Sequence, residues 1–305
     1  MITCPDEIRR VRPKSDDEWS GIEDDEWSGI EDFLLYLKHL KAYDFARELC
    51  RDKIVLDIGC GSGYGPRLIA QNAREVVAVD IDEMAIQYCR NHYSAPNLMF
   101  TKIAPGFPLP FEAGTFDVVT AFQVIEHIQP NYVRDFCLDV RRILKNGGQF
   151  LLTTPNRKLR LLPFQRPWNK EHYKEYTGRT LYKVLRKSFT DVKIKGLRAT
   201  HTIEAIEMQR VKQDPFIVYF VVPYVACFGG MYHAIKPFLP IWCVNTISLF
   251  WGMVLGRRRR KRHHELEQQD NSGKGFTGQF SLDDFFFTEK GINRSLDLVG
   301  ICRKV

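Results

Sequence analysis

Short apolar runs alternate with longer amphipathic stretches through most of the chain. The runs are rich in β-branched residues and end in acids or glycines, which predicts strands at 54–57, 75–80, 97–101, 116–122, 149–154, 191–198 and 296–303. Apolar residues three and four positions apart predict helices at 33–50, 66–72, 83–93, 132–145 and 179–189. This alternation indicates an α/β fold. Strands that are apolar throughout indicate a parallel sheet with helices on both faces.

Two longer apolar runs, 216–235 and 238–256, interrupt this pattern, and each has roughly membrane-spanning length. Six consecutive basic residues follow at 257–262, and then a polar linker. At the other end, residues 1–32 are polar and acidic and repeat the octapeptide DDEWSGIE. Two short copies are too few for a repeat fold, so the segment is predicted to be a tolerant arm. The alternative is a docking segment built on Trp19 and Trp27.

Composition and charge narrow the class of protein. With 305 residues, 44% of them hydrophobic, the chain is predicted to be globular, with one elaborated domain or two small ones. The net charge is +7, and the tract 257–262 supplies six of these charges, which argues against a broad nucleic-acid-binding face. The eight cysteines form no C-x-x-C pair, so they are predicted to be reduced thiols in a cytosolic compartment, without a zinc framework. No signal peptide is expected, because the first residues lack an apolar stretch.

A glycine-rich turn follows the first strand and carries the strongest chemical signal. It reads Asp57-Ile-Gly59-Cys-Gly61-Ser-Gly63, and glycines let the backbone turn sharply and approach a ligand. The second strand ends at Asp80, about twenty residues later, where a carboxylate can accept hydrogen bonds from two ribose hydroxyls. A dinucleotide fold would need G-x-G-x-x-G, whereas this turn has G-x-G-x-G after an acid.

Four motifs in order resemble those of the class I, seven-stranded S-adenosylmethionine-dependent methyltransferases: VLDIGCGSGYG, VVAVDID, FDVVTAFQVIEHI and ILKNGGQFLLTTPN. The resemblance covers about 33–198 and the last ten residues or so. It implies a Rossmann-like seven-stranded sheet with helices on both faces, whose final strands, 191–198 and 296–303, are antiparallel. The two apolar runs would form a hairpin inserted before the last strand. The expected organisation is an arm at 1–32, a methyltransferase domain at 33–198 plus 280–305, and an insertion at 199–279 that holds the hairpin, the basic tract and the linker.

The same resemblance implies S-adenosylmethionine as the cofactor and assigns residues to it. Asp80 would bind the ribose hydroxyls, and Ile81 would pack on the adenine. The remaining expected cofactor-binding residues are Asp57, Gly59, Gly61, Gly63 and Gln123. One departure stands out: the family's acid after the third strand is absent, because residues 102–106 read Lys-Ile-Ala-Pro-Gly. The adenine would then be recognised by backbone groups, or the cofactor would bind more weakly.

Polar residues after the fourth strand are candidates for catalysis. Glu126 and His127 lie there, and a neutral imidazole such as His127 can accept a hydroxyl proton. The alternative is a structural histidine that caps the next helix. In some relatives an E-x-x-E-H pattern at this point holds a divalent metal. Gln123 replaces its first acid here and is a poorer ligand for a hard cation, so no metal is expected.

A second group of candidates lies after the fifth strand. The segment 169–176 has the pattern N-x-x-H-x-x-E-Y and resembles methyltransferases associated with sugar and cell-envelope polysaccharide biosynthesis. His172, Glu175 and Tyr176 would then line the acceptor side. The alternative for these three is a surface loop.

The two apolar runs predict contact with a membrane. The strands 191–198 and 296–303 must pair in one compartment, so the segment between them crosses a membrane twice or not at all. Basic residues beside both runs favour ends on the cytoplasmic side, whereas Pro223 and Pro240 oppose full spanning. A spanning hairpin, an interfacial or re-entrant hairpin, and a buried dimer contact or acceptor lid all remain open. The position of the basic tract favours anionic lipid headgroups, so contact through 216–262 is expected.

These patterns predict a membrane-associated methyltransferase on the cytoplasmic side, acting on a hydroxyl of a lipid-linked or cell-envelope glycan. A second hypothesis is an O-methyltransferase of a lipid-soluble quinone. A third, of a different class, is a non-catalytic cofactor-binding scaffold anchored at the membrane. No nucleic-acid partner is expected, and the oligomeric state is left open.

Overall fold

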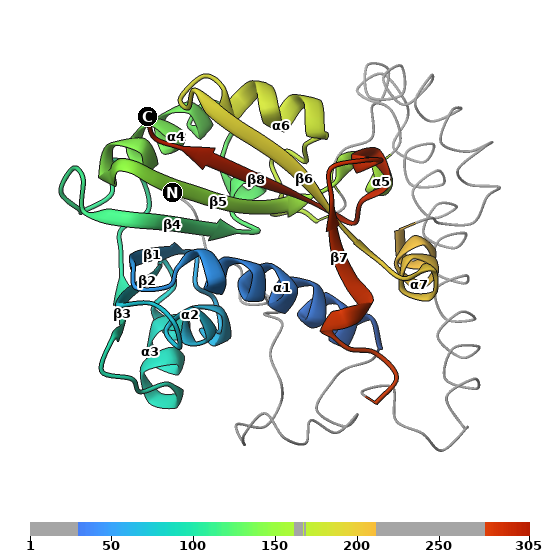
Figure 1. Ribbon diagram of the computed structural model, residues 1–305, viewed down its shortest axis with the longest axis horizontal. Helices are drawn as coiled ribbons and strands as arrows, with labels where there is room; N and C mark the ends of the chain where they lie inside the picture. The colour runs from blue at the N-terminus through green and yellow to red at the C-terminus, as the bar shows by residue number, and fades with distance from the viewer. Residues whose placement is uncertain (1–29, 162–166, 168, 212–277) are drawn as a thin grey trace, which may run out of the picture. The chain divides into compact units, whose positions relative to one another are not determined.

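The computed structural model in Figure 1 describes residues 30–161, 167, 169–211 and 278–305. These residues form a mixed eight-stranded sheet with the order β3-β2-β1-β4-β5-β8-β6-β7. The parallel half contains β1 (Ile54–Ile58), β2 (Glu75–Asp80), β3 (Leu98–Lys102), β4 (Phe116–Phe122) and β5 (Leu144–Pro155). Its central strands are buried along most of their length, as expected for a parallel sheet covered on both faces.

The other half of the sheet is antiparallel and contains β6 (Asp191–Ala199), β7 (Phe285–Thr288) and β8 (Asp297–Arg303). β8 lies between β5 and β6 and runs antiparallel to both. The predicted pairing of the final two strands is therefore confirmed. The predicted strand number is wrong, because β7 adds an eighth strand beside β6. β7 has only four residues, Phe-Phe-Phe-Thr, and such a short run carries neither alternation nor a length signal.

Helices cover both faces of the sheet, as predicted. They are α1 (Ile30–Leu49), α2 (Tyr64–Ile69), α3 (Glu83–His92), α4 (Val133–Ile143), α5 (Arg157–Arg160), α6 (Gly178–Leu185) and α7 (His201–Val211). On one face, α4 packs on β5 and α6 packs on β6 and β8, over a hydrophobic core that also includes Val77 and Val79. α3 packs on Ala78 and Phe100 on the other, and α1 contacts α2 (Figure 1). Successive residues of β2 thus point to opposite helical layers.

Contacts divide the chain into two units, Met1–Val211 with Gln279–Val305, and Lys212–Gly278. The first unit is the domain described above. The predicted apolar runs and basic tract at 216–262, and the arm up to residue 29, lie outside the described residues. The described part of the predicted insertion includes α7, which contacts α1, α5 and β6. No helix in the described ranges is long and apolar enough to cross a membrane.

Candidate active site

The glycine-rich turn between β1 and α2 has the backbone that its sequence predicts. Gly59, Gly61 and Gly63 all have positive φ, at 75°, 55° and 82°. A side chain at Gly59 would also collide with Val124, because a Cβ there would lie 2.7 Å from its Cγ2 atom. A Cβ at Gly61 would meet nothing within 4 Å. Gly59 therefore packs the turn against the end of β4, and Gly61 leaves open space beside it.

Asp80 links the glycine-rich turn to the end of β2. Its carboxylate oxygens accept hydrogen bonds from the backbone N–H groups of Gly61, at 2.9 Å, and Asp82, at 3.0 Å. Each carboxylate oxygen has a second lone pair, so two hydroxyl donors can still be accommodated. The adjacent Ile81 is 49% exposed, which leaves an apolar surface beside the carboxylate. This arrangement could accept a sugar edge on Asp80 and a flat ring on Ile81. The assignment of both residues to the cofactor stays a prediction.

Asp57 occupies a different environment from Asp80, because its side chain is fully buried. It accepts hydrogen bonds from the hydroxyl of Thr120, at 2.5 Å, and of Tyr43, at 3.3 Å. Burial raises the pKa of Asp57 to about 7, against these hydrogen bonds and with a smaller contribution from Asp80. Asp57 therefore stabilises the glycine-rich turn from the protein interior. The sequence analysis missed both partners, since Tyr43 is on α1 and Thr120 is on β4.

The predicted departure after the third strand is visible in the structure. Lys102, the last residue of β3, forms an ion pair with Glu83 at 3.3 Å. Ile103 is buried, and its N–H donates to the carbonyl of Asp80. A basic side chain and a buried apolar one therefore stand where the family has an acid.

Gln123 follows β4 in a strained conformation, with a φ of 56°. Its side-chain amide donates to Asp297 Oδ2 at 3.0 Å and to Thr153 Oγ1 at 3.1 Å. Asp297 is buried and also accepts a hydrogen bond from Lys38 Nζ at 3.1 Å. Sequence reasoning assigned Gln123 to the cofactor but missed this network, which joins α1, β4, β5 and β8. The assignment of Gln123 to the cofactor stays a prediction.

The two groups of predicted catalytic residues lie together. The backbone N–H groups of Tyr173 and Lys174 donate to the carbonyl of Glu126, at 2.8 and 3.3 Å. These bonds bring the loop after β5 to the end of β4. As a result, the rings of His127 and His172 meet edge to face, with centroids 4.7 Å apart.

Two buried acids, Glu126 and Glu175, belong to the cluster around His127 and His172. Glu126 is fully buried and accepts a hydrogen bond from Thr154 Oγ1 at 2.9 Å, while its Oε1 has no hydrogen-bond partner. Glu175 is buried and its Oε1 lies 3.0 Å from Nδ1 of His172 and 3.5 Å from Nε of Arg160. Tyr176, another of the five predicted catalytic residues, is 1% exposed and lies in the hydrophobic core.

Burial shifts the ionisation of the cluster. It raises the pKa of Glu126 to about 8, with smaller contributions from the charges of Asp297 and Glu175. It lowers the pKa of His127 to about 4, helped by the facing His172 and opposed by a hydrogen bond to the backbone of Glu171. A low dielectric disfavours the charged form in each case. Near neutral pH, Glu126 is therefore largely protonated and His127 is neutral.

Potential metal-binding atoms of Glu126, His127 and His172 all lie within 4.8 Å of one another. This spacing could admit a small cation after modest side-chain movement. Gln123, which replaces an acid in the metal-binding pattern, turns its amide donor toward Asp297 and Thr153 instead. The expectation that no metal is bound stays a prediction.

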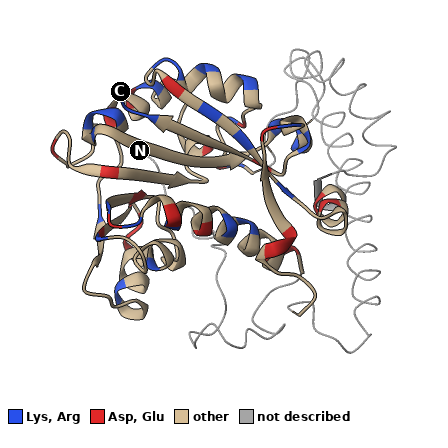
Figure 2. Cartoon of the chain, in the orientation of Figure 1, with Lys and Arg blue, Asp and Glu red and all other residues tan. Residues whose placement is uncertain are grey.

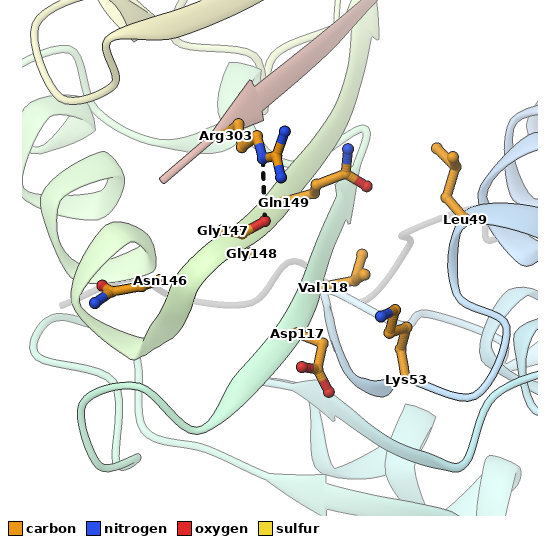
Figure 3. A pocket seen from close by; sticks show the side chains of 9 residues that line it. All are labelled: Leu49, Lys53, Asp117, Val118, Asn146, Gly147, Gly148, Gln149 and Arg303. Atoms are coloured by element: carbon orange, nitrogen blue, oxygen red, sulfur yellow. Dashed lines mark hydrogen bonds between the residues drawn. The ribbon is translucent and has the colours of Figure 1, made fainter. Parts of the chain in front are cut away.

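A separate pocket of about 460 Å³ lies at the amino ends of the central parallel strands, opposite the end that carries the glycine-rich turn (Figure 3). Its lining residues are Leu49, Lys53, Asp117, Val118, Asn146, Gly147, Gly148, Gln149 and Arg303. Lys53 and Asp117 lie at the amino ends of β1 and β4. Open α/β sheets bind their ligands at the carboxyl ends of the strands, so this pocket is not the candidate active site.

The sequence matches known methyltransferases over a part of the chain that includes the glycine-rich turn, Asp80 and the end of β4. Residues 56–152 match the family described as a methyltransferase domain. A probable S-adenosylmethionine-dependent methyltransferase of Mycobacterium tuberculosis is 36% identical over 165 residues, which are 53% of this chain and 58% of that protein. A mitochondrial ubiquinone biosynthesis O-methyltransferase of Schizosaccharomyces pombe is 33% identical over 138 residues, 41% of this chain and 48% of that protein. The chain therefore spans about half the length of these curated relatives.

A solved structure from Thermotoga maritima, described as a SAM-dependent methyltransferase and possible histamine N-methyltransferase, has the same fold. It covers 90% of this chain and 95% of its own, with a TM-score of 0.50 and 12% identity. At this identity the likeness shows the fold alone. The match over 56–152 shows that the chain contains a methyltransferase domain, and the observed fold agrees with that match. The matched domain and the names of the relatives support the predicted enzyme class and S-adenosylmethionine as the cofactor. The activity of the whole protein stays a proposal. The glycan association stays a prediction.

Proposed function

We propose that this protein transfers the methyl group of S-adenosylmethionine to a hydroxyl of a lipid-linked or cell-envelope glycan. The observation that carries this proposal is the contact between the loop 169–176 and the end of β4. That loop has the pattern that suggested a glycan acceptor, and it places His172 beside His127. Gly59 packs on Val124, so the cofactor turn and this cluster share one edge of the sheet.

The residues present fit the cofactor. Asp80 offers a carboxylate with spare lone pairs, Ile81 offers an exposed apolar surface, and Gly61 leaves open space in the turn. When bound, the sulfonium supplies an activated methyl group, whose carbon–sulfur bond breaks with its electron pair going to sulfur. The protein must then position the acceptor oxygen, exclude water and remove the hydroxyl proton.

The surroundings of the loop support an acceptor that carries negative charge. α5 follows β5 directly and contains Arg157, Lys158 and Arg160, which colour it blue in Figure 2. Arg160 reaches Glu175, so the basic helix lies next to the cluster. Phosphate groups of a lipid-linked glycan would find complementary charge here.

A quinone-type acceptor is the second candidate, and the names of several relatives favour it. Ubiquinone biosynthesis O-methyltransferases of Schizosaccharomyces pombe and Pseudomonas aeruginosa match 41% and 34% of this chain. Both acceptors are membrane-associated. We therefore also propose that 216–262 contacts the cytoplasmic side of a membrane, with its basic tract on anionic headgroups.

A labelled-methyl assay separates the two acceptors. The full chain is incubated with S-[methyl-³H]adenosylmethionine and a detergent extract of membranes from the cells that make it. Label that mild acid releases into the aqueous phase as a methylated sugar supports the glycan. Label that stays in a hexane-soluble aromatic lipid supports the quinone. Failure to bind S-adenosylmethionine in calorimetry would overturn both.

A further inference from the structure

His172 is the histidine best suited to proton transfer, because it contacts the buried acid Glu175. The side chain of Glu175 is 0% exposed, and its Oε1 lies 3.0 Å from Nδ1 of His172. Nε of Arg160 lies 3.5 Å from the same oxygen and forms an ion pair with the Glu175 carboxylate. A carboxylate can only accept hydrogen bonds, so Nδ1 of His172 must carry the proton.

This contact decides what the other ring nitrogen can do. With the proton on Nδ1, Nε2 of a neutral His172 has a free lone pair. No residue in the described ranges hydrogen-bonds to that nitrogen. His172 retains 7% side-chain exposure, and its ring lies against His127 at the carboxyl ends of the strands. A proton acceptor is therefore oriented at the mouth of the site by a buried partner.

His127 lacks this support. Its hydrogen bond goes to the backbone of Glu171 rather than to a carboxylate, and burial lowers its pKa to about 4. A base with so low a pKa gains little driving force when it removes a hydroxyl proton near neutral pH. The protonated Glu126 lies beside it and is a proton donor rather than an acceptor.

We propose that His172 is the general base of the methyl transfer and that Glu175 is its positioning residue. This inference rests on the proposed function. As the acceptor oxygen bonds to the methyl carbon, its O–H bond breaks, the electron pair stays on oxygen and the proton moves to Nε2 of His172. The imidazolium then loses that proton to solvent, which returns the enzyme to its starting state. Glu175 stabilises the imidazolium but takes no proton.

The first test uses chemical rescue, because a purely structural histidine would not respond to it. In the labelled-methyl assay with membrane extract, His172→Ala should lower turnover by about 10²- to 10⁴-fold. Added imidazole should restore part of that turnover. S-adenosylmethionine affinity, measured by calorimetry, should change less than about twofold, since His172 is not among the residues assigned to the cofactor. His92→Ala, on the end of α3, is the matched control and should keep its turnover.

The second test addresses Glu175. Glu175→Gln keeps the shape and an oxygen that accepts from Nδ1, but removes the negative charge. It should lower turnover by about tenfold and move the acidic limb of the pH–rate profile to lower pH, because the imidazole becomes a weaker base. A residue that only supports the fold would lower activity without moving the profile.

Three results would overturn the inference. One is His172→Ala with turnover near wild type, and another is rescue by imidazole of His127→Ala instead of His172→Ala. The third is one equivalent of Zn²⁺ retained by the wild type, lost in His172→Ala and required for turnover, which would make Nε2 a metal ligand. In all three cases the wild type still transfers methyl groups, so the proposed function stands. No transfer by the wild type would overturn the function and this inference together.

Discussion

Lys38 and Asp297 form a buried ion pair, with Nζ 3.1 Å from Oδ1 and side chains 3% and 2% exposed. They are 259 positions apart, on α1 and β8, so the pair joins the beginning and the end of the described domain. Asp297 also accepts from Gln123 at 3.0 Å. The ion pair therefore fixes α1 beside the end of β4, where the candidate active site begins.

The first prediction concerns this pair. Lys38→Met should lower the free energy of unfolding by about 3–5 kcal/mol, because it leaves the carboxylate of Asp297 buried without its cation. Lys41→Met, on the same helix and only partly buried, is the control and should change stability much less. Urea denaturation measures both. Equal effects of the two substitutions would show that the pair contributes little.

The second prediction concerns Asp80. Asp80→Ala removes two charge-assisted hydrogen bonds to the ribose, each worth roughly 1.5–3 kcal/mol, and should weaken S-adenosylmethionine binding by at least about 100-fold. Glu75→Ala, at the exposed amino end of the same strand, should bind normally. Calorimetry checks the affinity and a thermal melt checks the fold. An unchanged affinity in Asp80→Ala would refute the ribose assignment.

The third prediction separates backbone strain from loss of ligand space. Gly61→Ala and Gly114→Ala both place a Cβ on a residue of positive φ, and neither Cβ meets an atom within 4 Å. Each should therefore cost a similar stability of roughly 1 kcal/mol. Only Gly61→Ala should also weaken cofactor binding, because its methyl group enters the space beside the turn. Matching affinities for the two variants would mean that the cofactor does not use this space.

The fourth prediction is a pH dependence that comes from Glu126. Its pKa is raised to about 8 in the folded state from 4.5, so the folded chain holds the proton more tightly than the unfolded chain. The resulting stability is complete below the unfolded pKa and is lost as the pH rises through about 8. Glu126→Gln cannot ionise and should lose less stability than the wild type between about pH 4.5 and pH 8, the interval between the unfolded and folded pKa values.

Urea denaturation at several pH values measures this difference. Part of the slope should remain in Glu126→Gln, because Asp57 also has a raised pKa, about 7, and loses its proton in the same direction. Glu112→Gln, an exposed acid, is the control and should follow the wild type. A Glu126→Gln curve parallel to the wild type would show that Glu126 is already ionised.

The fifth prediction concerns the apolar segment. Leaving its two runs in water would cost roughly 25 cal/mol per Å² of apolar surface, and the basic tract would add about 1 kcal/mol per charge near an anionic leaflet. The full chain should sediment with membranes and need detergent for release. With 216–262 replaced by a short Gly/Ser linker it should stay in the supernatant and still bind S-adenosylmethionine, since β6 and β8 pair directly.

Two results would contradict this expectation. Release of the full chain by salt alone would reduce the contact to electrostatics. A full chain that stays monomeric in the supernatant without detergent would mean that the apolar runs are covered by the protein itself.

The sequence alone determined the strands of the parallel half, the helices between them, the glycine-rich turn and the acid at Asp80. These features depend on interactions within about a dozen residues: apolar periodicity, the conformational freedom of glycine, and the end of a buried strand. The local sequence of each element is therefore sufficient to predict that element. The short β7 lacked such a pattern and was missed.

Only the tertiary structure decided which of these residues meet. The pairing of Lys38 with Asp297, and the contact of His172 with His127, depend on how distant segments meet at the same edge of the sheet. Burial then sets their chemistry: it raises the pKa of Glu126 and lowers that of His127, although the sequence shows only an acid beside a histidine. Desolvation depends on the whole fold, and for that reason the roles of these side chains could not be read from their order along the chain.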